Sequence, residues 1–214
     1  MALELMIGAV DQVKDRWVGT QFVALGAPLL PSRSMYVEHM EVESYGGGRA
    51  IRYIGIDLPL CAKSVLLGYL RFWLGIAAFA SPFVLMWGES LSFSRPELRI
   101  TAALIALWIF VVFVPGRLWG EARRKVELLG DVTGVYLDPA RFDAIQREGR
   151  RAGLGDVIAQ RGVSVDDPEK VRLSIARADR ELLGSIYAFA RYAAVDRRDW
   201  KIVADEAWAR LQRV

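Results

Sequence analysis

Side chains that could act as a nucleophile, a general base or a metal ligand are scarce in this sequence. It contains one histidine, His39, and one cysteine, Cys61. A Cys/His metal site or a redox-active cysteine pair needs more of these residues, and a catalytic triad would depend on His39 alone. His39 stands in a strand-like run beside acidic residues, which favours a surface position. The sequence therefore predicts no catalytic residue, no metal site and no cofactor.

Short motifs that resemble catalytic loops have simpler explanations. Residues 130–134 (GDVTG) lack the compact Asp-Thr/Ser-Gly triplet of an aspartic protease because Val132 intervenes, and we expect a turn there. The isolated Gly-Leu-Gly at residues 153–155 has no third glycine and follows no predicted strand, so it is not a dinucleotide-binding loop. The carboxylates at residues 166–169 precede a predicted helix, whose dipole they favour. An enzyme that works with carboxylates alone is kept as a third possibility.

Two almost purely apolar segments dominate the hydropathy pattern. The first, residues 64–87, contains one ionisable side chain, Arg71, and the second, residues 100–114, contains none. A transmembrane helix needs about 20 apolar residues to cross a hydrocarbon layer of about 30 Å. We therefore predict a transmembrane hairpin at residues 63–119, with spans at about 64–87 and 99–118 and a short external loop at 88–98. A buried helical hairpin of a soluble protein is the alternative.

Arg71 lies near the start of the first span, about 10 Å along a helix from Ser64. Its long stem could carry the guanidinium back to the headgroups, and we favour this over pairing within an oligomer or a position in a pore. The basic side chains at and beside the spans are predicted to contact anionic lipid headgroups. These residues are Lys63, Arg71, Arg117, Arg123, Arg124 and Lys125. Because the basic excess follows the second span, both termini are predicted to be cytoplasmic.

Residues 1–62 are predicted to form a small antiparallel β module, with an SH3-like arrangement as one form that it could take. The strand-like runs are residues 17–25, 34–44 and 49–60. The glycines at 46–48 predict a tight hairpin turn, whereas Pro28 and Pro31 argue against a regular central strand. Apolar residues at helical spacing within residues 3–13 predict a short amphipathic helix that covers the sheet.

Residues 120–214 are predicted to form a helical module. The pairs Asp138-Pro139 and Asp167-Pro168 each combine an N-cap oxygen with a proline suited to a first turn, so each predicts the start of a helix. The second of these helices is expected to continue through Ala194, and a last helix to cover about residues 199–214. We expect the β module and the helical module to touch and form one composite cytoplasmic body.

Charge and composition narrow the class of partner. Residues 126–214 carry equal numbers of acidic and basic side chains, so the net charge of +3 comes from the flanks of the apolar segments. This distribution predicts no nucleic acid partner.

Arginine far outnumbers lysine and alanine is abundant, which is typical of a bacterial protein. We therefore predict a two-span protein of the bacterial inner (cytoplasmic) membrane, in contact with the lipid bilayer. Its predicted role is binding or scaffolding, with an unknown cytoplasmic protein or a homo-oligomer as partner. The alternative is a subunit of an oligomeric pore or transporter.

Overall fold

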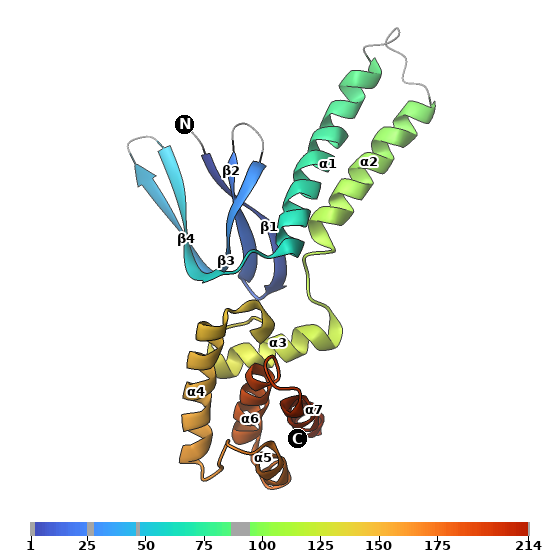
Figure 1. Ribbon diagram of the computed structural model, residues 1–214. Coiled ribbons are helices and arrows are strands. Elements are labelled where there is room, and N and C mark those ends of the chain that lie inside the picture. Colours follow the sequence, from blue (N-terminus) through green and yellow to red (C-terminus); the bar gives the residue numbers. More distant parts are fainter. Residues whose placement is uncertain (1–2, 25–27, 46–47, 87–94, 214) are drawn as a thin grey trace. The chain divides into compact units, whose positions relative to one another are not determined.

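The computed structural model describes residues 3–24, 28–45, 48–86 and 95–213, and over these residues the chain is an α+β protein, as predicted. This described part contains one four-stranded antiparallel sheet and seven α-helices. The chain divides into two compact units. Met1–Leu118, here called the sheet–hairpin unit, holds the sheet and two long helices, and Trp119–Val214, the helical unit, holds the other five helices (Figure 1).

The sheet is a meander whose strands pair in sequence order. They are β1 (Leu3–Val13), β2 (Arg16–Ala24), β3 (Pro28–Tyr45) and β4 (Gly48–Leu58). β2, β3 and β4 confirm the three predicted strands. The Tyr45–Gly48 pair joins β3 to β4 where a glycine hairpin was predicted, and residues 46–47 lie outside the described residues. The SH3-like form stays a prediction.

β1 corrects the amphipathic helix predicted for residues 3–13. Its pairing with β2 shifts register between Ile7 and Val10 and again between Val10 and Val13. Gly8 has a φ of +78° and Asp11 a φ of +52°, and each lies in one of these two irregular stretches. An extra residue in a strand changes which face the following side chain takes. Val10 and Val13 are therefore both buried although they lie three positions apart. The bulges thus give the buried residues of this strand a spacing that resembles that of a helix.

β3 contains both Pro28 and Pro31, so it begins earlier than the predicted run at residues 34–44, but the stretch with the prolines is not a regular central strand. The pairing of β3 with β4 starts at Ser34, which pairs with Leu58, so the stretch before it is paired with β2 alone. A proline is tolerated where one side of a strand has no partner. The pairing of Phe22 with Pro31 also follows a register shift, which is another position that accepts proline.

Two long helices, α1 (Ala62–Met86) and α2 (Arg95–Phe113), run side by side in the sheet–hairpin unit (Figure 1). A small residue lets them approach closely at Gly75. A Cβ atom on Gly75 would lie 2.9 Å from Nε1 of Trp108, and the Trp108 ring meets Phe79 edge-on at 5.5 Å. Trp108 is thus a packing residue between the two helices. Of the described helices, only Ala62–Val84 is long and apolar enough to cross a membrane, and Leu98–Phe113 is a shorter apolar helix.

A chain of buried hydroxyl groups joins α1 to the sheet. Ser64 donates to the Gly8 carbonyl at 2.7 Å, and Thr20 donates to Ser64 at 2.8 Å. Thr20 has one hydroxyl proton, so at the 2.9 Å contact between Thr20 and Ser34 the donor is Ser34. The backbone N–H of Cys61 donates to Ser34 at 2.9 Å and closes the chain. The three hydroxyl residues are fully buried and fix the first turn of α1 against β1, β2 and β3.

The helical unit is built around α6 (Arg180–Ala193), which is buried on most sides. The other elements are α3 (Gly120–Thr133), a short 3-10 helix (Pro139–Arg141), α4 (Ala144–Gln160), α5 (Pro168–Ser174) and α7 (Asp199–Leu211). The last predicted helix corresponds to α7. The predicted turn at residues 130–134 is instead the end of α3, which Gly134 terminates at a φ of +77°.

Two predicted helices of this unit are divided differently. Asp138 caps only the 3-10 turn, and α4 begins after Asp143, whose carboxylate accepts from the Gln146 N–H at 2.7 Å. Asp167 caps α5 as predicted, but the helix does not continue through Ala194. A new helix starts because Asp179 accepts from the Leu182 N–H at 2.8 Å and so serves as a second N-cap.

Candidate functional site

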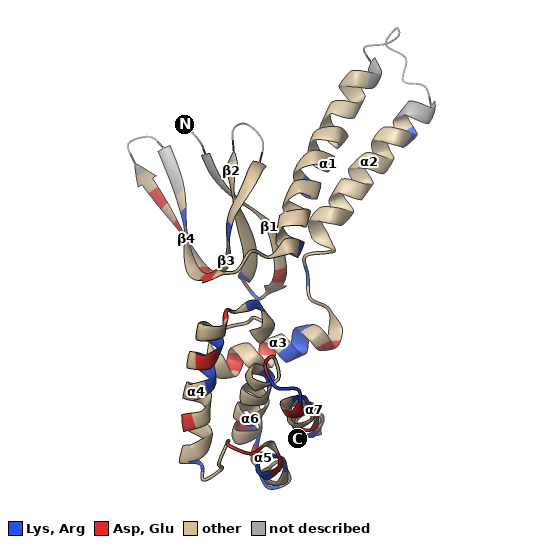
Figure 2. Cartoon of the chain, in the orientation of Figure 1, with Lys and Arg blue, Asp and Glu red and all other residues tan. Residues whose placement is uncertain are grey.

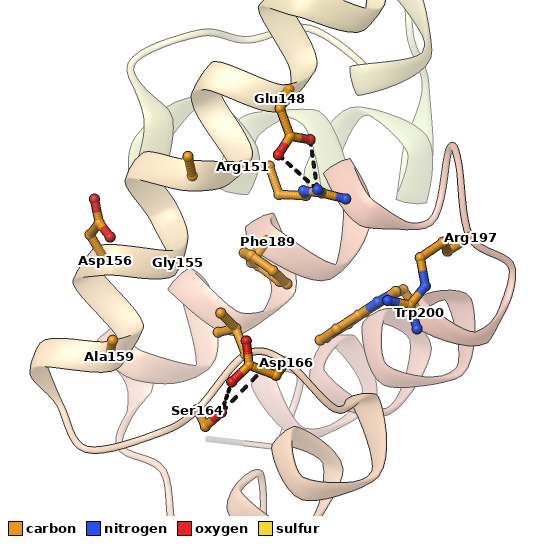
Figure 3. Close-up of a pocket in the computed structure, with 12 residues that line it drawn as sticks. Glu148, Arg151, Gly155, Asp156, Ala159, Ser164, Asp166, Phe189, Arg197 and Trp200 are labelled. Carbon is orange, nitrogen blue, oxygen red and sulfur yellow. Dashed lines mark hydrogen bonds and ion pairs between the residues drawn. The ribbon is translucent and has the colours of Figure 1, made fainter.

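A groove of about 570 Å³ lies on the helical unit, between α4, the segment before α5, and the facing parts of α6 and α7 (Figure 3). Its size is within the range of about 300–1,000 Å³ typical of ligand sites. The lining residues are Glu148, Arg151, Ala152, Gly155, Asp156, Ala159, Ser164, Val165, Asp166, Phe189, Arg197 and Trp200. They come from three stretches of sequence, which the packing around α6 brings together.

Two aromatic rings form the floor of this groove. Phe189 of α6 and Trp200 of α7 meet at 4.9 Å with their planes 70° apart, and both residues are almost fully buried. The Arg197 guanidinium lies 6.0 Å from the centre of the Trp200 ring. Figure 3 shows the rings between the Glu148–Arg151 pair on one side and the Ser164–Asp166 pair on the other. The floor is therefore packed and apolar, and the rim is charged.

The charges on the rim are only partly compensated. Arg151 pairs with Glu148 at 2.6 Å, and Arg197 pairs with Asp199, just outside the groove, at 2.6 Å. The hydrogen bond from Arg197 holds the pKa of the Asp199 carboxyl below its usual value. Asp166 accepts from Ser164 at 2.8 Å but forms no ion pair among the described residues, and neither does the exposed Asp156. The groove therefore presents two carboxylates that can accept a cationic group.

Among the described residues, no group of three or more His, Cys, Asp or Glu side chains is arranged to hold a metal ion. His39 is exposed on β3, as predicted, and Cys61 is buried at the start of α1. The arrangement in the groove is that of a binding surface: buried aromatic residues that can accept an apolar side chain, and a polar rim that can orient it.

The predicted lipid-contacting residues of the sheet–hairpin unit all lie close to β1. Lys63 forms an ion pair with Asp11 at 3.3 Å, and Arg117 pairs with Gln12 through an isolated bridge. Arg71 donates from Nη1 to the Ala9 carbonyl at 3.0 Å, and its other two bonds reach the last turn of α2. Snorkelling of Arg71 to headgroups stays a prediction. In the structure, its guanidinium donates hydrogen bonds to carbonyl groups of its own chain.

The other predicted lipid-contacting residues lie on α3 in the helical unit. Arg123 pairs with Glu127 at 2.8 Å, and Lys125 pairs with Glu121 at 2.8 Å. The hydrogen bond from Lys125 lowers the pKa of the Glu121 carboxyl. Arg124 is exposed. All three cations are accessible, so their contact with anionic headgroups stays a prediction.

Sequence reasoning did not identify the groove, because no stretch of the chain contains more than half of its lining. The carboxylates at 166–169 were assigned to a helix N-terminus, which is correct for Asp167 but leaves Asp166 free to line the groove. Trp200, a large aromatic residue that follows Arg197 and Arg198 by two or three positions, is the local signal for a binding surface.

No family model matches the chain, and comparisons with curated proteins and with solved structures give no match.

Proposed function

We propose that the protein is an integral protein of the bacterial inner membrane whose hairpin, α1 and α2, anchors a binding unit at the cytoplasmic face. The observation that carries this proposal is the exposure of apolar side chains on both helices. Phe79 is 66% exposed, Phe83 70% and Phe110 54%. Soluble proteins rarely leave so large a continuous apolar surface uncovered. In a bilayer the same side chains would be solvated by lipid.

The distribution of charge supports the same proposal. Figure 2 shows few charged residues along α1 and α2 and many on α3 to α7. Within the described part of the hairpin, Arg71 is charged but has its guanidinium bonded to carbonyl oxygens, which is how intramembrane cations are usually accommodated. The second apolar helix is shorter, and tilt or local thinning of the bilayer compensates for such a mismatch.

The sheet contributes a further apolar surface beside α1. Tyr69 donates its hydroxyl to the Leu29 carbonyl at 2.7 Å, which places the start of β3 about 10 Å along α1 from its first residue. Leu29 and Leu30 are 48% and 67% exposed there. If α1 spans the membrane, this end of the sheet lies at the boundary between headgroups and acyl chains, where exposed leucines are stabilised.

The cytoplasmic role that we propose is recruitment of a polypeptide through the groove of the helical unit. The buried Phe189 and Trp200 suit an apolar side chain, and Asp156 and Asp166 suit a neighbouring lysine or arginine. Such a combination of an aromatic pocket with a charged rim is typical of interface hot spots. No observation favours the pore alternative, because the hydrogen bonds of Arg71 are made within its own chain.

Membrane insertion is tested first, by cysteine labelling in intact cells. In a Cys61→Ser background, single cysteines replace Ser92, in the predicted external loop outside the described residues, and Ala176, which is exposed in the helical unit. A membrane-impermeant reagent is expected to label position 92 only, and alkaline carbonate is expected to leave the protein in the membrane. Labelling of position 176 alone would invert the topology, and extraction by carbonate would refute the anchor.

The groove is tested with a photo-crosslinking residue at Ala159, inside it, and at Ala209, exposed on α7 outside it. We expect one defined protein to be captured at position 159 only. The double variant Asp156→Asn/Asp166→Asn should lose this capture, whereas Asp205→Asn, a carboxylate outside the groove, should retain it. Equal capture from both positions, or capture that survives the double variant, would contradict the proposed groove.

A further inference from the structure

A second cavity, of about 340 Å³ and open to the surface, lies in the sheet–hairpin unit where β1 and β2 face α1 and α2. Its walls are apolar: Met6, Trp17, Phe72, Trp108 and Val112 line it together with glycine and aliphatic residues of β1 and α1. The indole N–H of Trp108 is already bonded to the Arg71 carbonyl at 3.0 Å, so it offers no polar group to a ligand. The cavity therefore suits a hydrocarbon chain.

Two glycines allow close packing at the edge of this cavity. The Trp17 ring lies across Gly19, where a Cβ atom would be 2.2 Å from the ring. Gly68 faces the sheet from α1, and a Cβ atom there would be 3.0 Å from the ring of Phe22. Gly68 thus lets α1 approach the sheet closely, whereas Gly19 lets the Trp17 ring lie over its own strand, and both Trp17 and Gly68 line the cavity.

The one charged group in the wall is the Arg71 guanidinium. Its Nε and Nη2 donate to the carbonyls of Val111 and Val112 at 3.1 and 3.2 Å, and its Nη1 donates to that of Ala9 at 3.0 Å. Gly116 leaves room for it, since a Cβ atom there would lie 2.8 Å from Nη2. A guanidinium has five N–H groups, so two remain available.

The charge of Arg71 is not neutralised by these bonds. Carbonyl oxygens satisfy donors but carry no net charge, and Arg71 forms no ion pair among the described residues. A half-buried cation beside an apolar cavity favours an anion, and the planar guanidinium suits a carboxylate or a phosphate in particular. The apolar space and the cation together define a ligand with one hydrocarbon part and one anionic part.

We propose that this cavity binds an anionic phospholipid of the surrounding bilayer, with one acyl chain between β1, Trp17 and α2 and its phosphate against Arg71. The inference rests on the proposed membrane location, because only then is the cavity in contact with lipid. Arg71 lies about 10 Å along α1 from Ser64, near the headgroup end of the predicted span, where its long side chain is within reach of a lipid phosphate.

The test is native mass spectrometry of the full chain in detergent with phosphatidylglycerol or phosphatidylcholine added at equal concentration. Both lipids have a phosphate, but the choline of phosphatidylcholine cancels its charge. We therefore expect one phosphatidylglycerol per chain, retained at least about tenfold more than phosphatidylcholine, the ratio expected for one contact with a net anion. Arg71→Gln should abolish this preference. Val112→Phe, which fills the cavity and keeps Arg71, should reduce retention of both lipids, whereas Ile109→Phe, at an exposed position of the same helix, should change nothing.

Equal retention of the two lipids, or a preference that survives Arg71→Gln, would overturn the proposal. Oleate retained in preference to phosphatidylglycerol would overturn the assignment to a phospholipid. If Arg71→Gln does not fold, the comparison of Val112→Phe with Ile109→Phe still decides whether the cavity holds the lipid. Failure of the membrane anchor is seen separately, as release by alkaline carbonate, whereas failure of the lipid site is seen in a protein that stays in the membrane.

Discussion

The hydroxyl chain between α1 and the sheet can be tested with a probe that the protein already contains. Cys61 is 4% exposed, and its N–H donates to Ser34 at the end of that chain. A thiol reagent can reach Cys61 only when this junction opens. The labelling rate of the native protein therefore measures the free energy of local opening.

Ser64→Ala removes the hydroxyl that bonds both Gly8 and Thr20. The Gly8 carbonyl loses its 2.7 Å partner. In addition, either Thr20 or Ser34 is left with a hydroxyl proton that has no acceptor, because only one hydrogen bond can form between these two hydroxyl groups. A buried polar group without a partner costs about 1–3 kcal/mol. We expect the two losses together to lower the opening free energy by about 2 kcal/mol or more, so Cys61 should react about 30-fold faster.

The assay is the rate of Cys61 modification in detergent micelles, at reagent concentrations where the rate follows the open population. Ser81→Ala is the matched control because Ser81, in the same helix, donates to the Ala78 carbonyl and contacts Thr101 of α2, both away from the sheet. Its rate should stay close to that of the unmodified protein. A Ser64→Ala rate within about threefold of the unmodified protein would refute the reasoning, because the hydroxyl chain would then contribute under about 1 kcal/mol.

Three further predictions follow from other parts of the fold. Burial raises the pKa of the Tyr187 hydroxyl, which has no hydrogen-bond partner among the described residues. The unfolded chain loses this proton near pH 10 while the native protein keeps it, so stability is lost as pH rises above about 10. Tyr187→Phe should remove this loss in alkaline urea denaturation and raise the free energy of unfolding by about 1 kcal/mol at neutral pH; a destabilised variant would count against it. Gly8→Ala places a Cβ atom 2.1 Å from the carbonyl oxygen in the first turn of α1, at a φ of +78°. It should lower the free energy of unfolding by about 2 kcal/mol or more, whereas Gly153→Ala, which meets nothing within 4 Å, should be neutral or stabilising in the same denaturation. Finally, an environment-sensitive fluorophore on a cysteine at Leu30 should shift to the blue in liposomes, and one at the exposed Asp15 should not; identical spectra would place the start of β3 outside the lipid boundary.

The sequence was sufficient for elements whose signal is local. The apolar runs predicted α1 and α2, the β-branched runs predicted β2 to β4, and Asp167 predicted the start of α5. Each of these follows from composition or from a cap that acts within one turn. Asp179 is a cap of the same kind, followed by Glu181 in the first turn, and the break before α6 could have been predicted from it.

β1 was missed for a different physical reason. Its bulges lie where Gly8 and Asp11 adopt positive φ, and they shift the alternation of buried residues to a spacing of three. Periodicity alone cannot distinguish this pattern from a helix. Gly8 was the residue that could have raised the alternative, because glycine inside an apolar pattern often marks a bulge.

Arg71 shows most clearly what the sequence could not supply. From the sequence its only partners were the headgroups or another copy, since no acidic residue lies within its own span. In the fold, carbonyls from β1 and from the last turn of α2 converge on its guanidinium. Every residue has a backbone carbonyl group, so no residue type in the sequence indicates where carbonyls will converge on a cation. Through these three bonds, the Arg71 side chain of α1 connects the end of α2 to β1. An anion bound to Arg71 would therefore lie where the hairpin and the sheet are joined.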